Sequence, residues 1–253
     1  DRFAAYGLRS EALTTCYAMA ENVFAVTQGG IDSPVTVDII SQRGFLIERV
    51  ARSPEGDELS MKMLSCGLPI SNTRVKVMDD HHHDLSERSV GEIALQSDCM
   101  LTEYYKRPDA TAKVFHHGWY LTGDLGYMAN GEVYVTGRKK DLIIVGGKNV
   151  YPQDLETLAS EVPGIHPGRV VAFGVFNEDL GTEEVVLVAE RESNDLSPDQ
   201  LADTIRQRVT RGSDIALRYV KAVERGWLLK TSSGKIARGA NRDKYLAQLK
   251  AEG

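Results

Sequence analysis

The dipeptide Asn130-Gly131 places the strongest local constraint on how this chain folds. It stands between two apolar stretches, residues 125–128 and 132–135, and Asn-Gly readily supplies the two positive φ angles of a two-residue hairpin turn. Just before the hairpin, Gly123 permits a sharp bend that we expect to leave the carboxylate of Asp124 exposed. The sequence therefore predicts an antiparallel hairpin with an acidic group at its entrance.

A basic segment and a pair of glycines follow the hairpin. Residues 137–141 read Gly-Arg-Lys-Lys-Asp, and after a short apolar run the chain reaches Gly146-Gly147. Pro152 then favours the first position of a helix, where its missing N–H costs nothing. Because short strands precede this segment and an alternation of strands and helices follows it, we place a domain boundary at residues 138–141.

Composition bounds the class of protein. The chain has 253 residues, enough for one large or two smaller domains, and its net charge of −6 gives no basic surface for nucleic acid. It contains no run of about eighteen apolar residues, so no transmembrane segment is expected in this piece. Three widely spaced cysteines suit a reducing compartment, and we expect a cytoplasmic location.

Two halves with different strand and helix patterns are expected. Up to residue 137, short strand signals predict a small sheet or barrel, and they cover residues 35–40, 45–50, 74–78 and 92–95. Downstream, strands are expected at residues 170–175, 184–189 and 219–223, with helices after Ser197-Pro198 and at the end of the chain. The predicted fold class is therefore mixed, α/β and α+β, with residues 142–253 forming a small α+β domain.

Three polar features invite functional readings. Glu21 lies between apolar residues, either as a surface acid or as a carboxylate beside a substrate or Mg²⁺. Lys235, in a polar loop with Gly234, is either an exposed loop lysine or a cation for phosphate and carboxylate oxygens. Residues 81–83 are three histidines whose side chains diverge in a turn, so a solvated loop is favoured over a metal site.

Several motifs in order resemble those of the adenylate-forming superfamily, which contains acyl-CoA synthetases, peptide-synthetase adenylation domains and luciferases. Residues 17–21 are similar to a Tyr-Gly-x-Thr-Glu motif, and residues 120–124 to Tyr-x-Thr-Gly-Asp. Residues 137–149 are similar to the hinge motif, and residues 231–235 to the catalytic-lysine loop. The resemblance covers essentially the whole chain and corresponds to the C-terminal portion of such enzymes.

The resemblance implies a nucleotide site in the first half of the chain. Tyr17 would pack against the adenine of ATP or AMP, and Glu21 would hold Mg²⁺ near the triphosphate. Asp124 would accept hydrogen bonds from both ribose hydroxyls, with Arg138 adding a donor to the same sugar. Residues 1–137 would then be the end of the large adenylating domain.

The resemblance also implies a mobile second domain. Lys140, within residues 138–141, would be the hinge about which residues 142–253 swing between two half-reactions. Lys235 would bridge the attacking carboxylate and the α-phosphate, offsetting the repulsion between their oxygens.

Within the superfamily, the fatty acyl-AMP ligases are the most similar group, as residues 5–27, 64–70 and 149–156 indicate. Residues 32–64 resemble the insertion of these ligases, which that group associates with transfer to an acyl carrier protein; a tolerated surface insertion is the alternative. The implied function is ATP-dependent activation of a fatty acid as acyl-adenylate, with transfer to a carrier protein, for example a carrier domain of a polyketide or peptide synthase. A fatty acyl-CoA synthetase and a non-catalytic adenylate-binding module are the alternatives.

Two residues depart from the family pattern. Ala18 replaces a glycine near the adenine position, and Leu229 replaces a proline, which we expect to loosen the lysine loop. The phosphate loop and most of the acyl pocket of such enzymes would lie before residue 1. We therefore expect these 253 residues alone not to form acyl-AMP.

Overall fold

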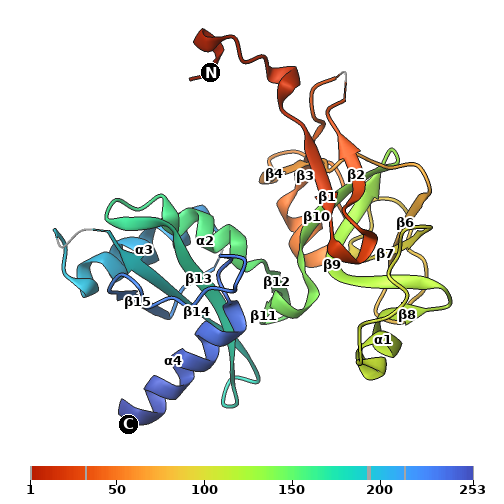
Figure 1. Cartoon of the computed structure of the whole chain (residues 1–253). Helices are drawn as coiled ribbons and strands as arrows, with labels where there is room; N and C mark the ends of the chain where they lie inside the picture. Colours follow the sequence, from red (N-terminus) through yellow and green to blue (C-terminus); the bar gives the residue numbers. More distant parts are fainter. Residues whose placement is uncertain (1, 32, 193–194, 214, 253) are drawn as a thin grey trace. The chain divides into compact units, whose positions relative to one another are not determined.

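The computed structural model describes residues 2–31, 33–192, 195–213 and 215–252. The chain divides into two compact units, the first ending at Lys140 and the second beginning at Asp141 (Figure 1). No helix in the described ranges is long and apolar enough to cross a bilayer.

The first unit is built mainly of short antiparallel strands. They are β1 (Thr15–Ala18), β2 (Ala25–Gly29), β3 (Val37–Ser41), β4 (Ser60–Leu64), β5 (Leu68–Pro69), β6 (Thr73–Met78), β7 (Gly91–Ser97), β8 (Phe115–His116), β9 (Trp119–Ala129) and β10 (Glu132–Arg138), with the helix α1 (Pro108–Val114). One sheet has the order β10-β9-β7-β6, with β8 beside β9; a second has the order β1-β2-β5; and β3 pairs with β4.

The predicted hairpin is confirmed, and it organises the larger sheet. Asn130 and Gly131 have φ angles of 53° and 78°, as a two-residue turn between β9 and β10 requires. Ala129 lies opposite Glu132, and the pairing continues back along both strands. Within the hairpin, the cross-strand partners Tyr127 and Tyr134 stack in parallel with ring centroids 4.7 Å apart, and both rings are buried. The hairpin is therefore fixed by packing as well as by its turn.

One predicted strand is wrong. Residues 45–50 were expected to be extended, but Gly44–Glu48 forms a π-helical turn that ends where Arg49 takes a φ of 56°. The Oγ of Ser41 accepts a hydrogen bond from the amide of Gly44 at its start. A run of only three apolar residues does not distinguish a strand from a helical turn, and here it has no partner strand.

The predicted insertion, residues 32–64, begins at Asp32, which lies outside the described residues. Its remainder contains the β3–β4 hairpin and the π-helical turn. Asp38 joins this segment to the rest of the unit, because its carboxylate accepts hydrogen bonds from Tyr127 at 2.9 Å and from Arg88 at 3.0 Å. Hydrogen bonds thus attach this segment to the β9–β10 hairpin.

The second unit combines a mixed sheet with helices. Its elements are β11 (Ile143–Val145), β12 (Lys148–Val150), α2 (Pro152–Ser160), β13 (Ile165–Asn177), β14 (Thr182–Arg191), α3 (Pro198–Gly212), β15 (Tyr219–Val223) and α4 (Arg238–Glu252). β13 pairs antiparallel with β14, and β14 pairs parallel with β15. Ser197 caps α3 through a reciprocal hydrogen-bonded box with Gln200. The expected strands and helices of this half, and the mixed α/β and α+β class, are confirmed.

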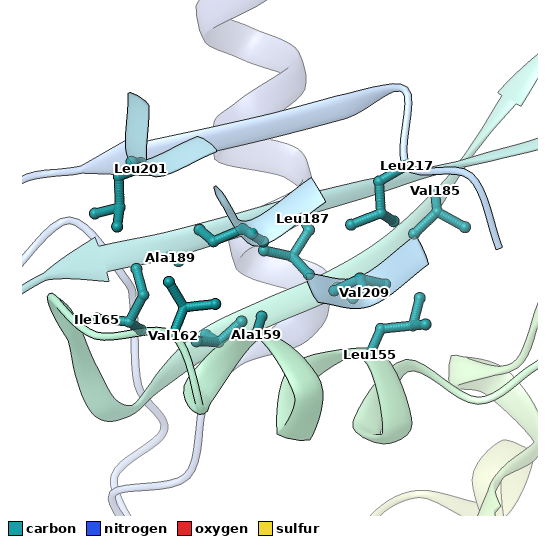
Figure 2. Packing of buried hydrophobic residues seen from close by; sticks show 14 of the residues in the cluster. Leu155, Ala159, Val162, Ile165, Val185, Leu187, Ala189, Leu201, Val209 and Leu217 are labelled. Atoms are coloured by element: carbon teal, nitrogen blue, oxygen red, sulfur yellow. The ribbon is translucent and has the colours of Figure 1, made fainter. Parts of the chain in front are cut away.

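Both faces of this sheet are buried. Alternate residues of β13 and β14, such as Ala172 and Leu187, face α2 and α3 in one apolar cluster (Figure 2). Their neighbours, such as Phe173 and Val186, face the opposite way, toward Tyr245 of α4. Two-sided burial explains why these strands read as continuous apolar runs rather than as an alternation.

Candidate active site

Asp124 lies in a bulge in the middle of β9. Between the pairs Glu92↔Leu125 and Ala94↔Leu121, β9 contains two more residues than β7, and Gly123 takes a φ of 71° in this bulge. The amide of Gly123 donates to Glu92 Oε1 at 3.0 Å, which fixes the bulge from the neighbouring strand. The bulge therefore sets the direction of the Asp124 side chain.

Arg138 is brought opposite Asp124 by a second irregularity. The β9–β10 register shifts by one residue between Val135 and Gly137, so that Arg138 pairs directly with Asp124. Arg138 Nε donates to Asp124 Oδ1 at 3.1 Å. If Thr136 were paired in regular register with Leu125, the register set by the turn would place Arg138 opposite Gly123. The sheet irregularities thus create the pair.

Tyr17 completes a three-residue cluster around this carboxylate. Its hydroxyl donates to Asp124 Oδ2 at 2.6 Å, and its ring is buried in the apolar core beside Val26 and Ile93. Burial, together with the neighbouring Asp124 charge, raises the pKa of Tyr17 well above its ordinary value, so the hydroxyl remains a donor. The structure places Tyr17 in the core, and its contact with adenine stays a prediction.

The expected exposure of Asp124 is wrong. The residue is only 7% exposed, because the bulge lies within β9 and the carboxylate turns toward Tyr17 rather than toward solvent. Each oxygen already accepts one hydrogen bond, from Tyr17 or from Arg138. A carboxylate oxygen has two lone pairs, so each retains the capacity to accept from one further donor.

Glu21 lies in a 3-10 turn, Ala20–Asn22, directly after β1. Its side chain and its backbone are both attached to the segment before α1. Tyr104 Oη donates to Glu21 Oε1 at 3.0 Å, and the amide of Leu101 donates to the Glu21 carbonyl at 2.8 Å. The hydroxyls of Tyr104 and Tyr120 lie 2.9 Å apart, so Glu21, Tyr104 and Tyr120 form a polar chain.

A cleft of about 590 Å³ in the first unit contains this polar chain. Its walls carry acids, cations and aromatic groups from residues far apart in the sequence. They are Glu21, His82, Glu92, Tyr104, Lys113, Val114, Tyr120, Leu121, Thr122, Gly123, Arg138, Lys139 and Lys140. Glu21, Arg138 and Lys140, three of the predicted site residues, therefore share one cleft. Arg138 also bonds Asp124, which accepts from Tyr17.

Glu92 and Lys139 form an ion pair in the wall of the cleft. The ammonium of Lys139 lies 3.0 Å from Glu92 and 3.0 Å from Asp80. Partial burial by itself lowers the pKa of Lys139, but the hydrogen bonds to Glu92 and Asp80 outweigh it and the pKa is raised. Lys139 lines the cleft together with Lys140, but its ammonium is held by two acids and has a structural role.

Lys140 and Lys235 are both exposed. Lys140 lies in the 3-10 turn Lys139–Asp141, and the two compact units divide directly after it. Lys235 belongs to the second unit, in a loop closed by its own hydrogen bonds: the amide of Thr231 donates to the Lys235 carbonyl at 2.8 Å. Gly234 supplies a φ of 82° in that turn.

The expected loosening of the lysine loop at Leu229 is wrong. The amide of Leu229 donates to Asn241 Oδ1 at 2.8 Å, and the Leu229 carbonyl accepts from Asn241 Nδ2 at 2.9 Å. A proline at this position has no N–H to donate. Leucine thus permits a different fastening, in which a buried asparagine holds the start of the loop.

Glu21 fits the part of a Mg²⁺ ligand in a site completed by a nucleotide. Across the described ranges, no group of three His, Cys, Asp or Glu side chains is placed to hold a metal ion by itself. Mg²⁺ is commonly held by one or two carboxylates together with substrate phosphates. A single carboxylate, oriented by Tyr104 and lining the cleft, agrees with that requirement.

Sequence reasoning missed three residues of this region: Glu92, Tyr104 and Asn241. Glu92 and Asn241 are buried polar side chains, and an acid inside the apolar stretch of residues 90–95 was an available signal for Glu92. Tyr104 and Asn241 gave no local signal, because their partners are 83 and 12 residues away.

Comparisons with known proteins agree on one family. A medium-chain-fatty-acid–[acyl-carrier-protein] ligase, JamA, of Moorena producens is 32% identical over 96% of this chain and 43% of its own length. The long-chain-fatty-acid–AMP ligase FadD32 of Mycobacterium marinum is 29% identical over 96% of this chain and 45% of its own.

A solved structure from a study of fatty acyl-adenylate ligases of E. coli and L. pneumophila matches 99% of this chain and 45% of its own, with a TM-score of 0.88 and 27% identity. No family model matches the chain. The chain thus spans less than half the length of these relatives.

Proposed function

Because this chain belongs to the adenylate-forming superfamily of acyl-CoA synthetases and fatty acyl-AMP ligases, we propose that the complete protein activates a fatty acid as acyl-adenylate. A carboxylate oxygen of the acid attacks the α-phosphorus of ATP, and the bond to pyrophosphate breaks. The thiol sulfur of an acyl carrier protein then attacks the acyl carbon, and AMP leaves. The similarity to an acyl-carrier-protein ligase supports a carrier protein as the acceptor.

The observation that carries the proposal is the Asp124 cluster. A buried carboxylate with a free lone pair on each oxygen suits the two adjacent hydroxyls of a ribose. Arg138, exposed on its outer side and already bound to Asp124, is placed to add a donor to the same sugar. Binding of the sugar needs little rearrangement, because Tyr17 and Arg138 already hold the carboxylate.

Glu21 and Lys235 are assigned the phosphate chemistry. Mg²⁺ held by Glu21 would offset charge on the triphosphate, and Tyr104 keeps that carboxylate directed into the cleft. Lys235 would bridge the incoming carboxylate and an α-phosphate oxygen, where one ammonium reduces the repulsion between two anions. Lys140, at the division between the two units, is proposed as the hinge that moves Lys235 between half-reactions.

Fatty-acid-dependent pyrophosphate release by the complete protein tests the proposal. Lys235→Ala is expected to lower the rate by about 100-fold or more, as for loss of a group that stabilises transferring charge. Lys230→Ala, another exposed lysine at the base of the same loop, is the matched control and should leave the rate unchanged. Equal rates for both variants would refute the assignment of Lys235, and absence of pyrophosphate release by the unaltered complete protein would favour a binding module without chemistry.

The acceptor is decided by a second measurement. With acyl-AMP formed, thioester appearance is compared for a carrier protein bearing a phosphopantetheine thiol and for free coenzyme A. We expect transfer to the carrier, because residues 32–64, which contain β3 and β4 and are anchored by Asp38, resemble the insertion of fatty acyl-AMP ligases. Faster transfer to coenzyme A would instead identify an acyl-CoA synthetase.

A further inference from the structure

The loop that carries Lys235 is fastened just before it begins. Two consecutive amides, those of Leu228 and Leu229, each donate to a buried side chain: Leu228 to Glu190 Oε1 at 2.7 Å, and Leu229 to Asn241 Oδ1 at 2.8 Å. Both Glu190 and Asn241 are fully buried. Hydrogen bonds to buried polar groups are costly to break, so this side of the loop is held firmly.

Asn241 reaches both ends of the loop. Its Nδ2 group donates to the carbonyl of Leu229 at 2.9 Å and to the carbonyl of Ala237 at 2.9 Å. Because Oδ1 also accepts from the Leu229 amide, both donor hydrogens and the acceptor of this amide group are used. A single side chain in the first turn of α4 therefore ties residue 229 to residue 237, with Lys235 between them.

Arg238, the first residue of α4, fixes the far side of the loop to the rest of the unit. Its three nitrogens each have a different partner: Nη1 bonds Asp141 at 2.6 Å, Nη2 bonds Glu156 of α2 at 2.7 Å, and Nε donates to the carbonyl of Ala172 in β13 at 2.9 Å. Glu156 also accepts from the Ala172 amide at 2.8 Å. The Arg238 side chain is 21% exposed, so these pairs are partly shielded from solvent.

Asp141, one of the partners of Arg238, lies at the boundary between the two units. It is the first residue of the second unit and directly follows Lys140. Arg238 therefore joins the point where the chain enters the unit to a helix start only three residues after Lys235. Through Arg238, Asp141 is thus bonded directly to the helix that begins at the end of the lysine loop.

From these contacts we infer that Arg238 and Asn241, in the first turn of α4, are positioning residues for Lys235. They make the loop move as one body with the segment that follows Lys140. The flexible Lys235 side chain is therefore attached to a backbone whose position is fixed within the unit. This inference rests on the proposed role of Lys235. Misplacing a reacting group by about 1 Å can cost on the order of 100-fold in rate, which is the effect that such a base prevents.

Steady-state kinetics of the complete protein test the inference. Arg238→Gln and Asn241→Ala are expected to lower kcat for acyl-AMP formation by about 10- to 100-fold while the KM for ATP changes less than about twofold. The KM should hold because the ribose and Mg²⁺ groups lie in the first unit. Arg242→Gln, an exposed arginine on the same helix, is the matched control and should leave both constants unchanged.

Hydrogen exchange separates positioning from a general loss of structure. In Arg238→Gln, the amides of residues 229–237 should exchange faster than in the unaltered protein, while those of the central strand β14 should not change. Exchange and kcat both equal to those of Arg242→Gln would overturn the inference. If Arg238→Gln does not fold, Asp141→Asn, which keeps the side-chain shape, decides in the same way: faster exchange in residues 229–237 supports the inference, and unchanged exchange overturns it.

Failure of the proposed function has a different signature. If Lys235→Ala retains full activity, the catalytic assignment is wrong whatever the exchange rates are. If Lys235→Ala is inactive while Arg238→Gln keeps normal kcat and exchange, only the positioning inference is wrong.

Discussion

Asp124 in the first unit and Lys235 in the second are held in opposite ways. Asp124 is buried and has partners on both oxygens, whereas Lys235 is exposed on a loop whose base, and not its side chain, is fixed. In the proposed function, Asp124 binds a neutral sugar, and its carboxylate can be held in place beforehand because its partners need not leave. Lys235 is proposed to meet a transferring phosphate, so its charge must stay available and only the backbone beneath it is fixed.

The largest expected effect on stability comes from removing the Asp124 carboxylate. Asp124→Ala leaves the Tyr17 hydroxyl and Arg138 without their acceptor, so the free energy of unfolding should fall by about 1–3 kcal/mol. AMP affinity should fall by about 10- to 100-fold, as for loss of hydrogen bonds to a charged group. Urea unfolding and calorimetric titration of the complete protein measure the two effects. Asp98→Ala, an exposed acid of the same unit, should change neither, and a similar loss there would contradict the comparison.

A smaller effect is expected from Tyr104→Phe. The change removes only the hydroxyl that orients Glu21, so the Mg²⁺ concentration needed for half-maximal activity should rise by about three- to tenfold. Tyr105→Phe is the control, because that neighbouring ring is 81% exposed. The measurement is a Mg²⁺ titration at saturating ATP. Equal Mg²⁺ requirements in the two variants would remove Tyr104 from the site.

The pairing of Lys139 predicts a pH effect confined to acid. The hydrogen bond from the Lys139 ammonium is the largest of the effects that together lower the pKa of Asp80 below the ordinary 3.8, although burial of Asp80 acts in the opposite direction. The stabilisation is therefore present above pH 3.8 and is lost as the pH falls below it. The raised pKa of Lys139 keeps its own contribution present below 10.5. Between pH 5 and about 3, the free energy of unfolding of Lys139→Met should therefore fall less than that of the unaltered protein, as measured by urea unfolding. Parallel losses would show that the pair contributes nothing.

The smallest expected effect is on the stability of Lys235→Ala. Because the side chain is exposed and the loop is held by backbone and buried groups, the free energy of unfolding should change by less than about 0.5 kcal/mol. Urea unfolding checks this against Asp124→Ala. A fall of more than about 1 kcal/mol would mean that Lys235 is a structural residue, and the contrast between the two regions would disappear.

Local chemistry made much of this fold predictable. The Asn130-Gly131 turn, Pro152 and the Ser197 cap each act over a few residues, and the corresponding hairpin and helices formed as expected. The burial of Asp124 and the bulges beside it were not predictable, because they depend on register between distant strands. The π-helical turn at Gly44–Glu48 was missed for a related reason: a short apolar run takes its conformation from the packing around it.

The fastening of Leu229 by Asn241 limits how this protein can be re-engineered. A lysine loop taken from a relative with proline at the first position would arrive without the N–H that Asn241 requires, and would leave a buried amide oxygen unsatisfied. The smallest segment that can be exchanged intact therefore extends from residue 228 to residue 241, the loop together with the first turn of its helix.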